Sequence, residues 1–396
     1  MSGAGPETTS GGFGGFGGFG GFGGFGGFGG FGGFGGFGGF GGFGGDAFDL
    51  LTSSALITTR DGIAGPWEGA LTGPEELALE SSDNLRFWAP WVRASLFEFE
   101  LSSRLAFTPS TGAGPKGRKV SVTVWHQELS AAPTPSANFV PLVEMKRPTM
   151  GSFRTQLDYL HSYAQLRSDR AQEITAQLGA PTAFLASIAF LHSHRTPHTL
   201  ELLALALRLA NLVEMRLKHA LACARPHELS PQVQPMIQTP AHGTLPSGHA
   251  TEAFTLARVL WAVISATPGS SYGDPAWGEQ LMRLAARIAV NRTVAGCHFP
   301  VDSAAGAVLG LTLGRYLVAR CTGATDTWGR RFDGTLYPAD DDFDWRLLFD
   351  VKIGEPLDPG FAPPLGKASA IAASPLLQWL WQKAVAEWQA PGGRDR

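Results

Sequence analysis

Apolar residues recur at every third or fourth position through most of the chain after residue 152, as expected for helices that bury one face. The clearest case runs from 200 to 224, where a single face carries Leu202, Leu205, Leu209, Leu212 and Leu217. The same spacing predicts further helices over 152–181, 183–192, 253–266, 276–290, 301–320 and 376–388.

A different pattern precedes these helices. Residues 55–59, 97–101 and 120–125 alternate between apolar and polar side chains or are rich in β-branched ones, and glycine and proline clusters surround them, so we predict short strands or extended segments. Residues 11–45 repeat Gly-Gly-Phe. Two glycines in every three positions leave no helix or strand period, so residues 1–45 are expected to be disordered, with self-association of the repeat as the alternative.

These patterns divide the chain into four segments. They are the repeat (1–45), strands and extended segments (46–141), a helical domain (142–323), and a loop-rich extension that ends in a helix (324–396). The predicted fold class is mainly α, with a small β-containing N-terminal part. The extension carries Asp340, Asp341, Asp342 and Asp344, whose spacing does not match a calcium loop, so we expect an exposed loop there.

Composition argues against several classes of protein. The 396 residues have a net charge of −3 and no basic run, so nucleic acid is not an expected partner. The three cysteines do not form a disulfide framework, the N-terminus lacks the layout of a signal peptide, and no apolar stretch has the length of a membrane span. We therefore expect a cytoplasmic protein, and a homo-oligomer is compatible with the sequence. His192, His194 and His198 lack cysteine or carboxylate companions and are interpreted as a solvated turn.

The residues best suited to chemistry surround the tetrapeptide 246–249, Pro-Ser-Gly-His, which joins a loop broken by proline and glycine to a predicted helix. Free N–H groups at a helix N-terminus favour an anion, and Gly248 lets a ligand approach the backbone. Ser247 adds a hydroxyl donor, and His249 adds a group that titrates near neutrality. Taken alone, Ser247 could be only a helix cap.

Charged residues flank this tetrapeptide on both sides. Lys218 and Arg225 precede it, and Arg292 follows, which together suit a tetrahedral oxyanion. His298 and Asp302 are four residues apart, so one helical turn would let the carboxylate orient the imidazole. Singly, the cations could be helix-end charges and the His–Asp pair an ordinary surface pair. Jointly, in this order, they predict an active site.

The set resembles the three-part signature of the superfamily that contains type 2 phosphatidic acid phosphatases, bacterial acid phosphatases and vanadium-dependent haloperoxidases. The first part is matched by Lys218, Arg225 and Pro226, the second by 246–249, and the third by Arg292, His298 and Asp302, with Asn291 where serine is usual. The resemblance implies a helical bundle that holds the oxyanion between helices. It also implies oxyanion binding by Lys218, Arg225, Ser247, Gly248 and Arg292, attack or ligation by His298, proton transfer by His249, and orientation of His298 by Asp302.

The same resemblance leaves two reactions open. The preferred hypothesis is a haloperoxidase whose vanadate cofactor is ligated by His298 and whose substrates are peroxide and a halide. Bromide is favoured because His242 lies seven residues before His249, where the resemblance implies a histidine in bromoperoxidases and a phenylalanine in chloroperoxidases. A second imidazole there could tune bound peroxide, although a loop histidine without a role is also compatible. The alternative is a phosphatase that needs no cofactor and hydrolyses a phosphate ester through a phospho-histidine. Cys297 favours this alternative, since a thiol beside the axial ligand would be oxidised by hypohalite.

Overall fold

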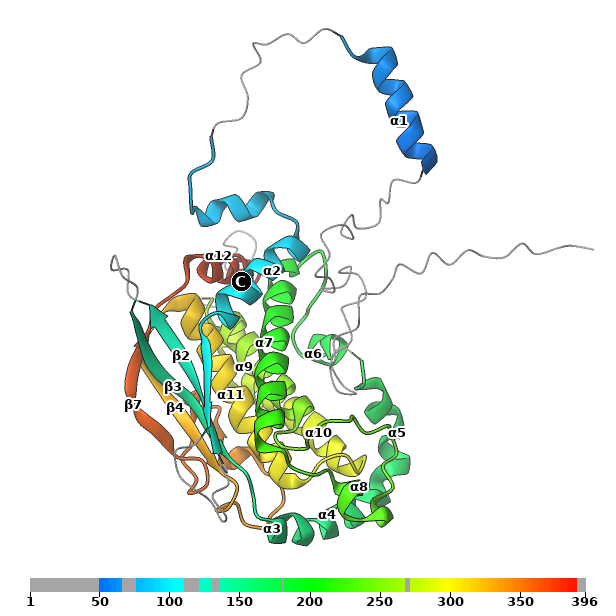
Figure 1. The fold of residues 1–396 in the computed structure, drawn as a ribbon, viewed down its shortest axis with the longest axis vertical. Coiled ribbons are helices and arrows are strands. Elements are labelled where there is room, and N and C mark those ends of the chain that lie inside the picture. Colours follow the sequence, from blue (N-terminus) through cyan, green and yellow to red (C-terminus); the bar gives the residue numbers. More distant parts are fainter. Residues whose placement is uncertain are drawn as a thin grey trace, which may run out of the picture.

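The computed structural model describes residues 50–65, 76–109, 121–129, 136–179, 181–267 and 271–389, so the predicted disorder of residues 1–45 lies outside the described residues (Figure 1). The helices are α1 (Leu50–Ile63), α2 (Pro90–Ser102), α3 (Met150–Thr155), α4 (Leu157–Tyr163), α5 (Arg167–Ala176), α6 (Thr182–Ala186), α7 (Pro197–Leu221), α8 (Pro226–Leu229), α9 (Gly248–Ser265), α10 (Pro275–Val294), α11 (Pro300–Thr322) and α12 (Pro375–Ala386). The strands are β1 (Leu105–Pro109), β2 (Ser121–Leu129), β3 (Ala137–Lys146), β4 (Ala324–Asp333), β5 (Phe349–Asp350), β6 (Glu355–Pro356) and β7 (Pro364–Ile371).

Helix α9 is the centre of the helical core, where it packs against α7, α10 and α11. Helices α9 and α11 approach so closely that only glycine fits at two positions of α11. A Cβ at Gly306 would lie 2.7 Å from the carbonyl oxygen of Ser247, and a Cβ at Gly310 would overlap the carbonyl oxygen of Thr251. This contact sets the first turns of the two helices side by side.

The long helices are held at their ends by residues from distant parts of the chain. Backbone amides of His198 and Thr199 at the start of α7 donate to the Glu387 carboxylate, at 2.7 and 2.9 Å. Glu387 directly follows α12, so the C-terminal helix caps α7. At its other end α7 stops at Ala222, which has a left-handed backbone with φ of 48°. The chain can therefore turn sharply after the helix.

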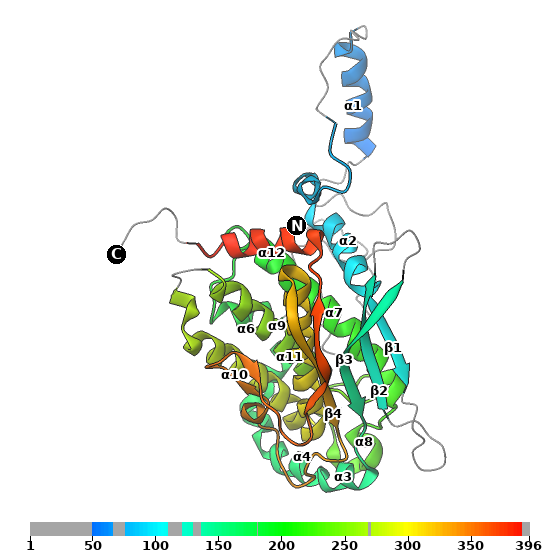
Figure 2. The ribbon, with the colours of Figure 1, turned by 90° about the vertical axis from the view of Figure 1, so that its left-hand side faces the viewer.

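A five-stranded sheet covers one side of the helical core (Figures 1 and 2). Its order is β1-β2-β3-β4-β7, and every neighbouring pair is antiparallel except β3 and β4, which are parallel. Buried residues such as Val124 and Met145 belong to the same hydrophobic core as the helices. The imidazole of His126 on β2 lies 3.0 Å from the Tyr316 hydroxyl on α11. Strands from before and after the helical region thus form one sheet.

The predicted fold class, mainly helical with some strands, is confirmed, and so is the strand predicted at 120–125, which corresponds to β2. The strand predicted at 97–101 is wrong, because these residues lie in α2. Phe97 and Leu101 are buried one helical turn apart, whereas Phe99 between them is exposed. Arg93, also on α2, forms a buried ion pair with Glu201 on α7 at 2.6 Å. Packing against α7 therefore decides the conformation of this short alternating pattern.

The strand predicted at 55–59 is also wrong, because α1 spans these residues. The threonines that favoured a strand donate to the carbonyl one turn earlier, Thr58 to Ser54 and Thr59 to Ala55. The helix predicted at 152–181 is interrupted and forms α3, α4 and α5, and that predicted at 183–192 is reduced to α6. The other predicted helices correspond to α7, α9, α10, α11 and α12.

No helix within the described part of the chain is sufficiently long and apolar to cross a membrane.

Candidate active site

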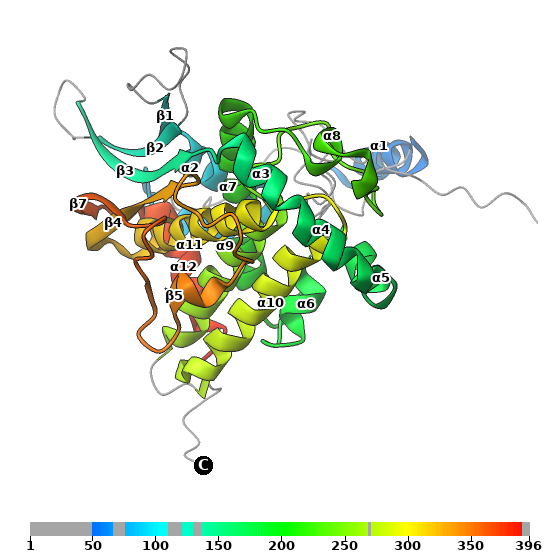
Figure 3. The same ribbon diagram turned by 90° about the horizontal axis from the view of Figure 1, so that it is seen from below.

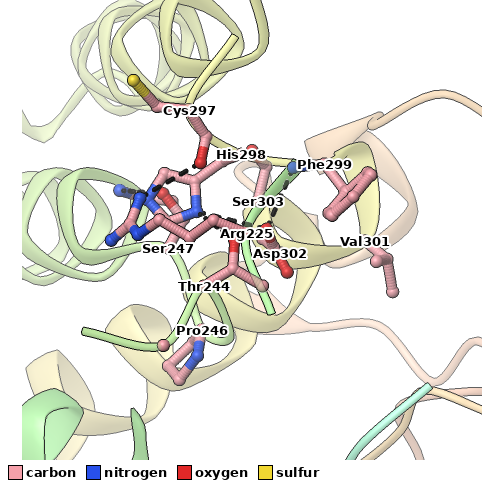
Figure 4. Close-up of polar contacts among 12 residues, drawn as sticks. Arg225, Thr244, Pro246, Ser247, Cys297, His298, Phe299, Val301, Asp302 and Ser303 are labelled. Atoms are coloured by element: carbon pink, nitrogen blue, oxygen red, sulfur yellow. Dashed lines mark hydrogen bonds and ion pairs between the residues drawn. The ribbon is translucent and has the colours of Figure 1, made fainter. Parts of the chain in front are cut away.

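Lys218 and Arg225 are placed by the end of α7 and the turn that follows it. Both side chains are buried, with 2% and 1% of their surfaces exposed. The Lys218 ammonium donates to the carbonyl oxygen of Pro246. The Arg225 guanidinium donates to the carbonyl oxygen of His242 at 2.8 Å. It also donates to the carbonyl oxygen of Cys297 at 3.1 Å (Figure 4). The first motif therefore contacts the loops that carry the second and third motifs.

Ser247 is the N-cap of α9, and its hydroxyl accepts from the amide of Ala250 at 3.5 Å. Its own amide donates to the carbonyl oxygen of Asp302 at 3.0 Å, which joins the start of α9 to the first turn of α11. Gly248 is the first residue of α9, and a Cβ there would lie 2.8 Å from a carboxylate oxygen of Glu214. The tetrapeptide thus lies at a helix N-terminus, as the sequence predicts, and a side chain at Gly248 would require Glu214 to shift.

His298 is oriented by two side chains (Figure 4). Its Nδ1 lies 3.2 Å from Asp302 Oδ2 and 3.1 Å from the hydroxyl of Thr244. The Thr244 hydroxyl in turn donates to Asp302 Oδ2, which also accepts from the amide of Phe299 at 2.9 Å. With the proton on Nδ1, the Nε2 atom of His298 keeps its lone pair. Thr244 escaped the sequence analysis because its contacts come from residues more than 50 positions away.

Burial shifts the pKa values of this pair strongly. It raises the pKa of Asp302 to about 6, against the opposite effects of the Thr244 hydroxyl and the Phe299 amide. Burial, together with the charges of Arg225 and Lys218, lowers the pKa of His298 well below its usual value. The imidazole is therefore neutral near pH 7, as a nucleophile or ligand must be.

Arg292 and His249, the last residue of the tetrapeptide, contact each other. A guanidinium nitrogen of Arg292 lies 3.2 Å from His249 Nε2, and the same ring nitrogen lies 3.2 Å from the carbonyl oxygen of Gln177. Burial, and then the charge of Arg292, lower the pKa of His249 well below its usual value. Burial lowers the pKa of Arg292 to about 10, so the guanidinium stays charged at neutral pH. Its Nε is buried without a hydrogen-bond partner.

Two buried glutamates, which the sequence analysis did not single out, lie near Lys218. Glu214 is one turn before it on α7, and Glu252 lies just after the first turn of α9. Burial raises the pKa of both carboxyl groups and lowers that of the Lys218 ammonium, while the charge of Glu214 favours the protonated lysine. The sequence could have identified Glu214, because it lies four residues before Lys218 and this spacing places both side chains on one face of a helix.

His242 and Cys297 lie beside the same arginine. His242 Nδ1 is 3.2 Å from a guanidinium nitrogen of Arg225, and burial lowers the pKa of His242 to about 4. The Cys297 thiol is buried against Val294, and burial raises its pKa, which keeps it protonated and unreactive. Within the described residues, no group of three or more His, Cys, Asp and Glu could hold a metal ion.

The structure thus brings all the residues of the three motifs to one place where α7, α9, α10 and α11 begin or end. The assigned roles remain predictions. Three buried cations, a helix N-terminus and an oriented imidazole together can bind a tetrahedral oxyanion and present a nitrogen lone pair to its central atom.

Comparison with known proteins identifies one family and one similar solved structure. The model of the PAP2 superfamily matches residues 200–324, which contain all three motifs. No curated protein matches the chain. Among solved structures, the chain is similar to one described as the first transmembrane PAP2 type phosphatidylglycerolphosphate phosphatase from Bacillus subtilis. The identity is 19% and the TM-score 0.34, with 42% of this chain and 85% of that chain covered.

Replacing Thr244 by valine should destabilise the protein. The variant removes the hydroxyl that donates to Asp302 and leaves a buried carboxylate with fewer donors, so the free energy of unfolding should fall by about 1–3 kcal/mol. Urea denaturation at pH 7 measures this loss. Thr244→Ser, which keeps the hydroxyl, is the control, and equal losses in the two variants would mean that the hydroxyl does not support Asp302.

The Asp302 pKa predicts a pH-dependent difference between the wild type and Asp302→Asn. Since the pKa in the folded protein, about 6, exceeds the usual value of about 3.9, Asp302 contributes stability at low pH that is lost as pH rises through 6. The free energy of unfolding of the variant minus that of the wild type should therefore increase by about 2–3 kcal/mol between pH 4 and 7. Urea denaturation across this range measures it, and a difference that stays constant would contradict the assignment.

Proposed function

We propose that this chain, whose residues 200–324 form a region of the PAP2 superfamily, is a phosphatase that hydrolyses phosphate monoesters through a phospho-histidine at His298. The superfamily match supports this alternative better than the halide oxidation that the sequence analysis preferred. The observation that carries the proposal is the neutral, oriented imidazole of His298 beside three buried cations.

Binding of the phosphate is assigned to the cations and the start of α9. Lys218, Arg225 and Arg292 are held by neutral carbonyl or amide oxygens in the structure. A phosphate oxygen carries negative charge and forms stronger, charge-assisted hydrogen bonds with such donors. In this reading the amide of Gly248 and the Ser247 hydroxyl complete the set of donors.

The first chemical step is attack by His298. Its Nε2 lone pair forms a bond to phosphorus while the bond from phosphorus to the ester oxygen breaks. The imidazole becomes positively charged, and Asp302 stabilises that charge through Nδ1–H. Because Asp302 also accepts from Thr244, the ring is held in one orientation before the substrate arrives.

His249 is assigned the two proton transfers. A phosphate dianion beside it would raise its pKa, opposing the effects of burial and of Arg292, so the imidazolium can protonate the departing oxygen. The neutral His249 then takes a proton from water as the water attacks phosphorus. The bond between phosphorus and His298 Nε2 breaks, and inorganic phosphate and the free enzyme are released.

A haloperoxidase remains a second candidate because His242 lies next to Arg225. The same donors fit vanadate, which has the shape of phosphate, and the unpartnered Nε of Arg292 is a further donor for it. Lys218, Arg225, Arg292, Ser247 and Gly248 would hold vanadate, with His298 Nε2 as its protein ligand. When bound, vanadate supplies a Lewis acid for peroxide.

His298→Ala should abolish hydrolysis of an aryl phosphate, with kcat/KM falling by at least about 1,000-fold because the nucleophile is lost. The exposed His194→Ala is the matched control and should retain wild-type turnover. Acid-labile phosphate on the peptide that contains residue 298, trapped by rapid quenching, identifies the intermediate. Substantial turnover by His298→Ala would exclude the covalent route.

Vanadate distinguishes the two candidate reactions. The proposed phosphatase should hydrolyse the aryl phosphate without vanadate and be inhibited competitively by it, because both oxyanions need the same donors. In parallel, peroxide, bromide and a phenolic reporter are supplied with vanadate. Bromination that exceeds the phosphatase turnover, and that falls in His242→Ala, would instead favour the haloperoxidase.

A further inference from the structure

The turn that ends α5 lies directly against the candidate active site. Helix α5 packs against α10, and Figure 3 shows it following α4 at the edge of the molecule. Gln177 follows the last residue of α5 and is 1% exposed. Its side-chain oxygen accepts from Arg292 at 2.8 Å, and its backbone oxygen lies 3.2 Å from His249 Nε2. One residue therefore contacts two groups assigned to oxyanion chemistry.

A further oxygen of α5 reaches the same guanidinium. The carbonyl oxygen of Ile174 accepts from Arg292 Nη2 at 3.3 Å. Two of the contacts of Arg292 are thus made by neutral oxygens from the C-terminal turn of α5. A phosphate that binds Nη2 of Arg292 or Nε2 of His249 therefore competes with these oxygens for the same hydrogen-bonding positions.

Asn291 anchors this turn of α5 to α10. Its amide nitrogen donates to the side-chain oxygen of Gln177 at 3.0 Å and to Glu173 at 2.8 Å, and its oxygen accepts from Arg170 at 3.0 Å. Asn291 occupies the motif position where serine is usual. A serine hydroxyl has a single proton and a shorter reach, so it could not make these three bonds together. The departure from the motif therefore coincides with a specific contact to α5.

Other ion pairs and hydrogen bonds hold the rest of α5. Glu173 forms a bidentate pair with Arg287 at 2.8–3.1 Å. Arg167, at the start of the helix, donates to the carbonyl oxygens of Val233, Gln234 and Val294 at 2.8–3.0 Å. The start of α5 therefore has supports of its own, while its end depends on Asn291 and Gln177.

We propose that Gln177 is an affinity-limiting latch, anchored by Asn291, that competes with the substrate's phosphate for Arg292 and His249. The inference rests on the proposed function, because it assumes that the cage binds phosphate. A charged phosphate oxygen displaces the amide oxygen through stronger hydrogen bonds, whereas a neutral group gains nothing by the exchange. The latch lowers the affinity for every oxyanion by the fraction of molecules in which it is open.

The test measures binding of inorganic phosphate to the full-length protein by calorimetry. Gln177→Ala removes the side-chain oxygen that competes for Arg292, and Asn291→Ser removes the amide that anchors Gln177. Each variant should therefore bind phosphate about tenfold more tightly than the wild type. Gln177→Glu places a carboxylate beside Arg292 and should bind about tenfold more weakly. Arg283→Ala is the matched control, since Arg283 pairs with Glu279 on the exposed side of α10. Its affinity should equal that of the wild type.

Hydrogen exchange supplies an independent readout. Saturation with phosphate should open the latch, so the amides of residues 173–177 should exchange faster. In the Asn291→Ser variant the same amides should exchange faster even without phosphate. Equal phosphate affinities in folded Gln177→Ala, Asn291→Ser and wild type would overturn the latch alone. So would greater protection of α5 in the presence of phosphate. Absence of phosphate binding in all the folded proteins would overturn both the latch and the proposed function.

Discussion

Burial of three cations at the meeting point of four helices is the constraint on which the rest of the site depends. A charge removed from water is costly unless it is paired or hydrogen-bonded. Lys218, Arg225 and Arg292 are at most 2% exposed, and carbonyl and amide oxygens from the surrounding loops accept their hydrogen bonds. These acceptors are neutral, and burial raises the pKa of the neighbouring Glu214 and Glu252 carboxyl groups, so the cations are not fully balanced by negative charge. This excess of positive charge is the physical basis of the proposed phosphate binding.

The fold keeps this cluster in place by fixing where helices begin and end. Close packing of α9 on α11, which Gly306 makes feasible, brings Ser247 to the first turn of α11. There, Asp302 accepts from Thr244 and orients His298. The same first turn therefore supports both the anion-binding loop and the proposed nucleophile. Two elements outside the site support these helices. The β-sheet covers α11, and Glu387 after α12 caps the start of α7.

The sequence predicted the parts of the site that depend on local spacing. A long helix that carries Lys218, a helix N-terminus beside the tetrapeptide 246–249 and the pairing of His298 with Asp302 each follow from neighbouring residues, and the superfamily predicted from them is confirmed. The helices α9 and α11 differ in detail, since α9 begins five residues earlier than predicted and His298 precedes α11. Contacts between distant segments were not predictable. Thr244 and Gln177 act through partners more than 50 positions away, and α2 is a helix because it packs on α7. Phosphate hydrolysis and halide oxidation were not separable either, because both use one arrangement of cations and one histidine.

The most direct measurement is a crystal structure of the protein with tungstate, a phosphate analogue whose anomalous scattering locates it without ambiguity. The account predicts a single strong site in which the oxyanion contacts Lys218, Arg225 and Arg292, with its central atom facing His298 Nε2. Tungstate bound elsewhere, or held by the cations with His298 turned away, would contradict it.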